Sequence, residues 1–352
     1  MPSASNSYLP LGTVWADPSS WHASNRRSEP MLKHLPYSVK NTFNVPVDEK
    51  AMVPGIDPNT LGDAKSLVPA IDPAFVFNID TLSDILAWYQ LSSTMQPQRK
   101  SGLYLVGPTG SGKTEYIRQI AARLNIPLIE VTGHDRLETT DLIAQRDIVG
   151  GDTLWLPGPL AQAWQIGAWF LLNEQDYLNP AAAAGLNEIW DAVRLPTGEV
   201  IRPAETARMI CTGNNANVDE TGSIAGTQRQ NPAFMDRFIF NVVGYPDPDT
   251  EAAIIMSKVK NLTKEIVDKM VQFANAVRKV ADVINGEGLD VAVSTRSMIT
   301  WGQMAAIYSN KPRITNALEH ALMKTIALKT TTPTQLRLKE IFGTVFGTAV
   351  SP

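Results

Sequence analysis

The chain has 352 residues, which is enough for two or three domains and a sizeable core. With 44% hydrophobic residues, 19% charged residues and a net charge of −4, its composition is typical of a soluble globular protein and argues against a dedicated nucleic-acid binder. No apolar run approaches the roughly 20 residues of a membrane span, and the N-terminus lacks a signal-peptide pattern. We therefore expect a cytoplasmic protein with no membrane association.

Cysteine and histidine usage points the same way. Cys211 is the only cysteine, which excludes an internal disulfide and fits a reducing compartment. We expect it to be a small buried hydrophobe on a strand rather than a reactive thiol. The four histidines are scattered without metal-ligand spacing, so a catalytic zinc site is not expected.

The first 66 residues are rich in Pro, Ser and Asn and show little periodicity. We interpret residues 1–66 as an irregular N-terminal arm, either mobile or laid over another surface. Aromatic residues such as Trp15, Trp21 and Tyr37 favour the second option, because disordered tails carry few aromatics. We expect the arm to dock on an adjacent copy of the chain. A helix is predicted next, at about 80–94.

From about residue 101 to 245 short apolar strands alternate with helices, a pattern typical of an α/β fold with a parallel sheet flanked by helices. We predict that this α/β core spans residues 67–247. After Pro246 and Pro248 the pattern becomes all helical, so residues 248–352 are predicted to form a helical lid domain. Residues 71–255 have a net charge of −10 and residues 256–352 a net charge of +6. Either these opposite charges help one copy's core to pack against a neighbour's lid, or the two segments differ in charge without any such role. The predicted strands are 102–106, 127–132, 168–173, 207–212 and 238–243, and the predicted lid helices are 249–259, 262–283, 295–307, 312–327 and 333–341.

Residues 107–114 read Gly-Pro-Thr-Gly-Ser-Gly-Lys-Thr, a complete match to the phosphate-binding pattern G-x-x-x-x-G-K-[ST]. The glycines let successive backbone N–H groups point at phosphates, and Lys113 reaches the β- and γ-phosphates. The Thr114 hydroxyl is placed to ligate Mg²⁺. A strand before the loop and a helix after it argue against a chance match in an ordinary turn. The predicted ATP-contacting residues are Gly107, Pro108, Thr109, Gly110, Ser111, Gly112, Lys113, Thr114 and Glu115.

The strand at 168–173 ends in Asn173 and Glu174, at the edge of the sheet where ligands of α/β folds bind. Glu174 is the predicted catalytic acid that polarises the attacking water, the alternative being a solvated acid at a strand end. Asn173 stands where ATPases with this type of phosphate-binding loop usually carry Asp. Its amide oxygen still accepts hydrogen bonds from metal-bound water but brings no charge, so the Mg²⁺ site formed by Thr114 and Asn173 should be weaker unless Asp176 compensates.

Two further residues are predicted to act on the γ-phosphate. Asn214, after the strand at 207–212, is placed to position the attacking water, with Asn215 as the second choice. The alternative is that both asparagines are turn residues. Arg296 lies in the first turn of a lid helix, from which its guanidinium can reach back to the γ-phosphate and couple nucleotide state to lid angle.

Arg237 follows a loop and a short helix and is predicted to project into a neighbouring subunit's site as an arginine finger, which neutralises transition-state charge. The alternative is a surface pair with Asp236, which would contribute little. Arg229 is a second finger candidate.

With these residues in place, the chain resembles the AAA+ ATPases of the MoxR type, and within them the ATPase subunits of aerobic cobaltochelatases, over about residues 67–310. This resemblance implies a P-loop AAA+ core and a homo-oligomeric ring, expected to be a hexamer, with nucleotide at each subunit interface. It also implies a partner bearing a von Willebrand factor A domain. Two hairpins, within 146–160 and at 193–201, are expected to project toward the pore or a client. The resemblance rests on residues 68–73, 76–77, 107–114, 124–125, 141–142, 226–228, 235–237, 296 and 299–301.

The favoured function is an Mg²⁺-dependent ATPase that remodels a client protein or assists metal or cofactor insertion. The client is not identified by the sequence. The alternative, motivated by Asn173, is a nucleotide-binding assembly or structural ring with weak or no turnover. A nucleic-acid motor is disfavoured by the acidic core and by the absence of a helix-turn-helix or aromatic stacking module, although the basic lid supports it.

Overall fold

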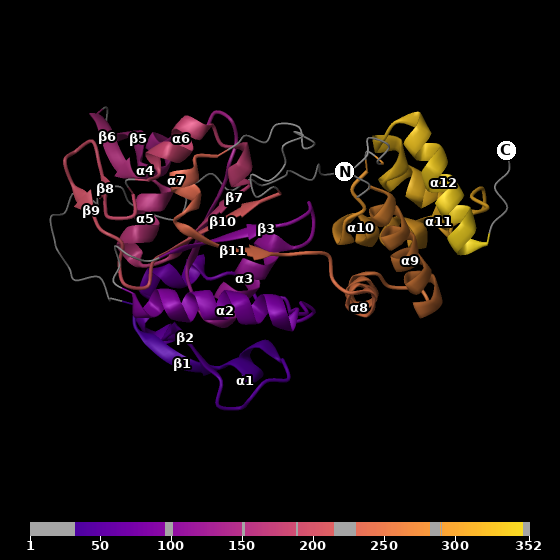
Figure 1. Cartoon of the computed structure of the whole chain (residues 1–352), viewed down its shortest axis with the longest axis horizontal. Coiled ribbons are helices and arrows are strands. Elements are labelled where there is room, and N and C mark those ends of the chain that lie inside the picture. Colours follow the sequence, from indigo (N-terminus) through magenta and orange to yellow (C-terminus); the bar gives the residue numbers. More distant parts are fainter. Residues whose placement is uncertain are drawn as a thin grey trace.

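The structure, a computed structural model, describes residues 32–95, 101–149, 152–187, 189–214, 230–281, 289 and 291–347. Its centre is a five-stranded sheet in the order β11-β3-β10-β7-β4, in which every neighbouring pair is parallel (Figure 1). All five predicted strands are confirmed, with ends within about one residue of those expected. The strands are β3 (Gly102–Val106), β4 (Leu128–Thr132), β7 (Trp169–Asn173), β10 (Arg208–Gly213) and β11 (Phe238–Val242).

Both faces of the sheet are covered, because successive side chains of a strand point to opposite faces. On β3, Leu103 and Leu105 join a buried cluster with helices α2 (Ile79–Thr94) and α3 (Lys113–Arg123). Tyr104, between them, joins the cluster on the other face. This alternation gives the two-layer covering that the strand–helix pattern predicts.

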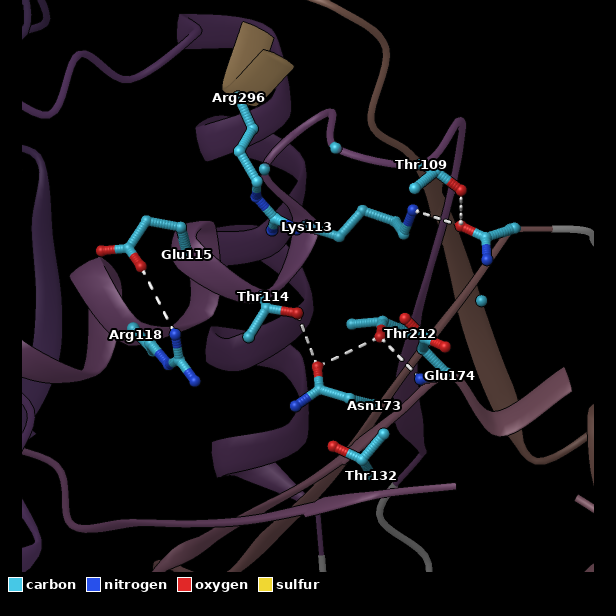
Figure 2. A pocket seen from close by; sticks show the side chains of 14 residues that line it. Thr109, Lys113, Thr114, Glu115, Arg118, Thr132, Asn173, Glu174, Thr212 and Arg296 are labelled. Atoms are coloured by element: carbon cyan, nitrogen blue, oxygen red, sulfur yellow. Dashed lines mark hydrogen bonds and ion pairs between the residues drawn. The ribbon is translucent and has the colours of Figure 1, made fainter. Parts of the chain in front are cut away.

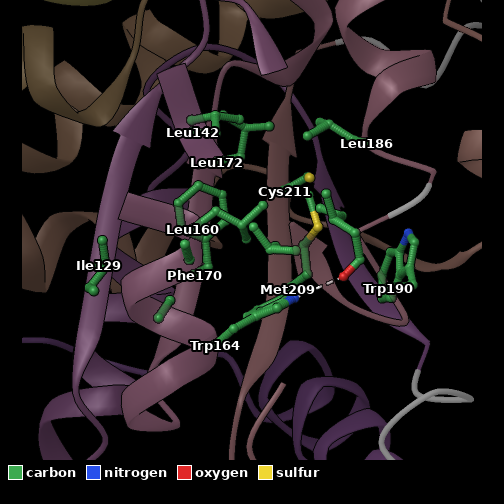
Figure 3. Close-up of a cluster of buried hydrophobic side chains, with 14 of the residues drawn as sticks. Ile129, Leu142, Leu160, Trp164, Phe170, Leu172, Leu186, Trp190, Met209 and Cys211 are labelled. Atoms are coloured by element: carbon green, nitrogen blue, oxygen red, sulfur yellow. Dashed lines mark hydrogen bonds between the residues drawn. The ribbon is translucent and has the colours of Figure 1, made fainter. Parts of the chain in front are cut away.

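On the second face, helix α5 (Pro159–Ile166) packs its Trp164 against Phe170 and Met209 (Figure 3). The Trp164 indole donates to the Ile189 carbonyl oxygen at 2.9 Å, which satisfies its polar group inside the core. Cys211 is completely buried here, and burial raises the pKa of its thiol well above the usual value. The prediction of a buried cysteine on a strand is confirmed.

The N-terminal region differs from expectation. Residues 32–66 are not irregular: β1 (His34–Ser38) pairs with β2 (Met52–Ile56) in an antiparallel ribbon, and Phe43 and Ile56 are buried in the same cluster as α2 and α3. Pro36 and Pro54 lie opposite each other in this ribbon, where the two-stranded arrangement tolerates the loss of ladder donors. These prolines concealed the strand pattern. Residues 1–31 of the expected arm lie outside the described residues.

The C-terminal region is all helical, as predicted, and is joined to β11 by residues 243–247 (Figure 1). Phe273, Trp301 and Phe342 are central to its own hydrophobic cluster. Its helices are α8 (Pro248–Lys258), α9 (Lys264–Ala281), α10 (Thr295–Tyr308), α11 (Ala317–Thr325) and α12 (Thr332–Phe346). None of the helices in the described ranges is long and apolar enough to cross a membrane.

Both predicted hairpins are present. Strands β5 (Ala144–Val149) and β6 (Asp152–Pro157) form the first, whose residues 150–151 lie outside the described residues. In the second, β8 (Val193–Arg194) pairs with β9 (Val200–Ile201). The remaining short elements are α1 (Val39–Phe43), α4 (Thr139–Ile143), α6 (Pro180–Gly185) and α7 (Pro232–Met235), with 3₁₀ turns at Pro58–Thr60, Gly62–Leu67, Gln175–Tyr177 and Ala327–Lys329.

Candidate nucleotide site

The loop at residues 107–112 joins β3 to the N-terminus of α3 and passes close to two other segments. A Cβ atom on Gly107 would lie 2.1 Å from the Val243 carbonyl oxygen. Gly110 has a φ of +75°, and a Cβ atom there would lie 2.4 Å from the Cβ atom of Ser294 in the lid. Only glycine fits both positions, so the loop is held against the core–lid linker and against the start of α10.

Lys113, the first residue of α3, points back across this loop. Its Nζ donates to the carbonyl oxygens of Gly107 at 2.7 Å and Pro108 at 3.0 Å, and to Asn214 Oδ1 at 3.0 Å. Burial lowers the pKa of Lys113 to about 8, although Asp176 and Glu174 partly offset this effect. The loop therefore holds a desolvated cation beside backbone N–H groups, an arrangement suited to phosphate.

The next residue, Thr114, contacts the end of β7. Its hydroxyl donates to Asn173 Oδ1 at 2.6 Å, and the same oxygen accepts from the Thr212 hydroxyl at 3.2 Å. The Asn173 amide nitrogen lies 3.5 Å from Glu130 Oε2. Glu130 in turn accepts two hydrogen bonds from Arg118, at 2.8 and 2.7 Å. The Asn173 amide oxygen thus faces Thr114, and its nitrogen faces a carboxylate.

Glu174 is exposed and has a left-handed backbone, with a φ of 53° and a ψ of 45°. Such a conformation is rare outside glycine and asparagine, and functional sites are enriched in it. The Glu174 N–H donates to Thr212 Oγ1 at 3.2 Å, which fixes the residue at the sheet edge. Its side chain lines the same cavity as Lys113 and Thr114 (Figure 2).

Asn214 bridges the phosphate loop and the end of β10. Its Oδ1 accepts from Lys113 Nζ and from the Thr109 hydroxyl, the latter at 3.3 Å. Its backbone N–H donates to Asp176 Oδ2 at 2.7 Å. Asp176 is almost fully buried and does not line the cavity, so its carboxylate holds Asn214 in place. That Asp176 compensates for the missing charge at Asn173 stays a prediction.

These groups surround a cavity of about 280 Å³ at the carboxyl ends of the strands, and Arg296 of α10 extends into it from the lid (Figure 2). A second cavity of about 350 Å³ adjoins it, sharing Glu115 and Arg296. The second cavity is more apolar, lined in part by Phe75 and Ile299, and an ion pair between Asp72 and Lys258 at 2.6 Å links core and lid beside it.

Arg237 lies away from both cavities of its own chain. Its side chain is exposed, with its guanidinium 5.9 Å from the centre of the Trp190 ring. In the described part of the chain, no ion pair joins it to Asp236. The other candidates, Asn215 and Arg229, lie outside the described residues.

Three cavity residues were not predicted from the sequence: Arg118, Thr132 and Thr212. Each carries a usable signal. Arg118 comes one turn after Thr114 on the same helix face, and Thr132 ends β4 as Asn173 ends β7. Since ligands bind at the carboxyl ends of parallel strands, polar residues at the ends of β4 and β10 are expected at the site just as those at the end of β7 are.

Family models match both the core and the lid of the chain. The family described as "AAA domain (dynein-related subfamily)" matches residues 102–238, and "CbbQ/NirQ/NorQ C-terminal" matches residues 251–345. The aerobic cobaltochelatase subunit CobS of a Sinorhizobium species is 32% identical over 290 residues, covering 78% of this chain and 80% of that protein. The chain belongs to the MoxR-type AAA+ ATPase family. Another relative, protein NorQ of Paracoccus denitrificans, is 28% identical over 247 residues, covering 69% of this MoxR-type chain and 86% of NorQ.

Proposed function

We propose that this MoxR-type protein binds ATP with Mg²⁺ and hydrolyses it to ADP and phosphate, working as a ring that remodels a client protein or assists metal or cofactor insertion. The observation that carries the proposal is the convergence of Lys113, Thr114, Glu174, Asn214 and Arg296 on one cavity. These groups come from the loop, two strand ends and the lid, and together they supply the parts that phosphoryl transfer needs.

The triphosphate would lie in the smaller cavity and the base in the adjoining, more apolar one. The three hydrogen bonds of Lys113 use all the donors of its ammonium group, so contact with a phosphate oxygen exchanges one of them. The N–H groups at the start of α3 add further donors. An aromatic wall at Phe75 supports a planar base in the second cavity.

The residues present fit Mg²⁺. Thr114 Oγ1 and Asn173 Oδ1 are hard oxygen donors 2.6 Å apart at the mouth of the phosphate loop. Within the described ranges no cluster of three His, Cys, Asp or Glu side chains could hold a metal by itself. Mg²⁺ commonly takes one or two protein ligands, with waters and substrate phosphates supplying the rest. Its chemistry there is to neutralise charge on the phosphates.

Glu174 would act as the base that orients and polarises the attacking water, and Asn214 would position that water beside the γ-phosphate. Asn214 already contacts Lys113, so one amide is placed to connect the water with the phosphate-binding cation. Arg296 would stabilise the charge that develops on the γ-phosphoryl oxygens.

We further propose a homo-oligomeric ring, a hexamer, in which Arg237 acts on the neighbouring subunit's nucleotide. The exposure of Arg237 away from its own cavity supports this arrangement. So does the edge strand β11, on which Ile239, Phe240 and Val242 remain 37, 40 and 71% exposed, because apolar edges are normally covered.

On the β5–β6 hairpin, Ile148 and Trp155 are 71 and 38% exposed, and the Arg146 guanidinium lies 4.9 Å from the Trp155 ring centre. We propose that this hairpin contacts the client. We also propose that the protein acts with a partner that bears a von Willebrand factor A domain, and that it is located in the cytoplasm. The acidic core favours protein over nucleic acid as the client, although the basic lid supports nucleic acid.

Steady-state ATP hydrolysis with Mg²⁺ tests the proposal. Lys113→Ala should abolish nucleotide binding, whereas Glu174→Gln should keep binding and lower turnover by about 10²–10⁴, the usual contribution of a general base. Wild-type turnover that is absent, with ATP binding intact, would favour the second candidate, a nucleotide-binding structural ring. The uncharged Asn173 at the metal site is the observation that keeps this second candidate in view.

A further inference from the structure

A continuous chain of polar contacts runs from the phosphate loop to the first turn of α10, which carries Arg296. It starts at the Thr109 carbonyl oxygen, which accepts from the Tyr245 hydroxyl at 3.1 Å. Tyr245 lies in the linker between β11 and α8, half-buried, and its ring is covered by the Arg278 guanidinium at 3.8 Å from the ring centre. The linker thus contacts the loop through its hydroxyl and the lid through its ring face.

Arg278 of α9 is fully engaged inside the lid. It makes a two-pronged ion pair with Glu251 of α8, with both nitrogen–oxygen distances at 2.8 Å. Its Nε donates to the Val293 carbonyl oxygen at 2.8 Å, just before α10. Glu251 is completely buried and Arg278 is largely buried, so water screens this ion pair only weakly.

Glu251 also holds the start of α10 directly. The Thr295 hydroxyl donates to Glu251 Oε1 at 2.6 Å. Thr295 immediately precedes Arg296, and Ser294, on its other side, faces Gly110 of the phosphate loop. The backbone that carries Arg296 is therefore fastened to α8 through Thr295 and to α9 through Val293.

We propose that this chain, Tyr245–Arg278–Glu251–Thr295, is the coupling that sets the position of Arg296 according to the state of the phosphate loop. Tyr245 and Thr295 are positioning residues: they act on the γ-phosphate through Arg296 and do not contact it. In this proposal a shift of the Thr109 carbonyl oxygen moves Tyr245, and with it the Arg278 guanidinium of α9, which holds Glu251 of α8 and the Val293 carbonyl oxygen two residues before α10. This inference rests on the proposed function, because it requires that ATP occupies the cavity.

The test measures the dissociation constants of ATP and ADP by calorimetry, with Mg²⁺, in a Glu174→Gln background that removes turnover. Tyr245→Phe keeps the ring over Arg278 and deletes only the hydroxyl donor to Thr109. Thr295→Val deletes the donor to Glu251 with little change in shape. Each should lower the preference for ATP over ADP by roughly two- to tenfold, the effect of one hydrogen bond on an equilibrium. Arg296→Ala should lower the same ratio.

The decisive comparison is a double-mutant cycle. If Tyr245 acts through Arg296, Tyr245→Phe should change the ratio no further once Arg296→Ala is present. Effects that multiply, or ATP and ADP affinities that fall equally, would overturn the inference. Tyr308→Phe, on the part of the lid where Tyr308 packs on His320, serves as the matched control and should leave the ratio unchanged. Failure of the Glu174→Gln protein to bind ATP at all would overturn the proposed function, and this inference with it.

Discussion

Three residues of the candidate site are held in place by contacts or by their backbone conformation. Lys113 is desolvated against loop carbonyl groups, Glu174 is placed by a left-handed backbone, and Asn173 is oriented between a hydroxyl and a carboxylate. In the proposed function, these constraints would fix where charge develops around a bound phosphate. They also give each residue a distinct experimental signature.

The lowered pKa of Lys113, about 8, predicts a pH dependence of ATP binding. Bound phosphates favour the charged amine, so above pH about 8 binding must take up a proton, and the dissociation constant should rise by up to about tenfold per pH unit. Without nucleotide, the unfolded chain binds this proton more tightly, so stability should rise between pH about 8 and 10.5. Calorimetry across pH 6–10 measures both effects. Lys113→Met should no longer bind nucleotide, and it should lose this pH dependence of stability. A wild-type ATP affinity that does not change between pH 6 and 10 would contradict the prediction.

Asn173→Asp should strengthen Mg²⁺ binding and lower the stability of the nucleotide-free protein. The new carboxylate adds the missing charge beside Thr114, so the Mg²⁺ concentration for half-maximal ATP hydrolysis should fall several-fold. It also faces Glu130 at the position of the amide nitrogen, so the melting temperature without ligand should fall by a few degrees, the effect of about 1 kcal/mol.

Asn179→Asp is the control for this substitution, because Asn179 is an exposed residue whose side chain accepts from the Ala181 N–H, a role that Asp fills equally well. An unchanged Mg²⁺ requirement in Asn173→Asp, or an equal change in Asn179→Asp, would show that the charge at residue 173 does not matter.

At the scale of elements, the sheet was predictable and the N-terminal ribbon was not. Buried parallel strands such as β3 are continuous apolar runs, which stand out in a sequence. The ribbon of β1 and β2 is short and contains Pro36 and Pro54, so its pattern reads as irregular chain. The contact of Glu130 with Asn173 could not be predicted either, because it depends on β4 lying beside β7, an order that the sequence does not state.

The link between core and lid through Asp72 and Lys258 gives an element-scale prediction. The hydrogen bond to Lys258 is the main reason that the pKa of Asp72 is lowered. Asp72 therefore contributes stability above its unfolded pKa of about 4, and this contribution is lost as pH falls through the lower folded value. At neutral pH, Lys258→Ala should weaken ATP binding by no more than about fivefold, since a partly exposed pair is worth roughly 0.2–1 kcal/mol.

High salt should shrink this effect, because exposed charges are screened. Lys264→Ala is the matched control: it removes an ion pair with Asp268 that lies within the lid and does not cross to the core. If Lys264→Ala weakened ATP binding as much as Lys258→Ala, the link between core and lid would have no specific role.

At the scale of the whole molecule, residues 1–66 have to be treated as two parts. Phe43, Val53 and Ile56 are buried in the core, so deleting residues 1–65 should destabilise the monomer by several kcal/mol, as removal of buried side chains does. Deleting residues 1–31 should leave the melting temperature near that of the full chain. If the arm docks on a neighbour, this shorter deletion should lower the oligomer mass in light scattering. An unchanged ring would refute that role.

We propose that a nucleotide lies between two copies of the chain, with Lys113 and Glu174 from one copy and Arg237 from the next. Mixing Lys113→Ala with Arg237→Ala protein and measuring ATP hydrolysis tests it most directly. Each variant alone should be inactive. In an equal mixture, about a quarter of the head-to-tail interfaces should combine an intact site with an intact Arg237, restoring about a quarter of wild-type activity. A mixture no more active than the average of the two pure variants would contradict the claim.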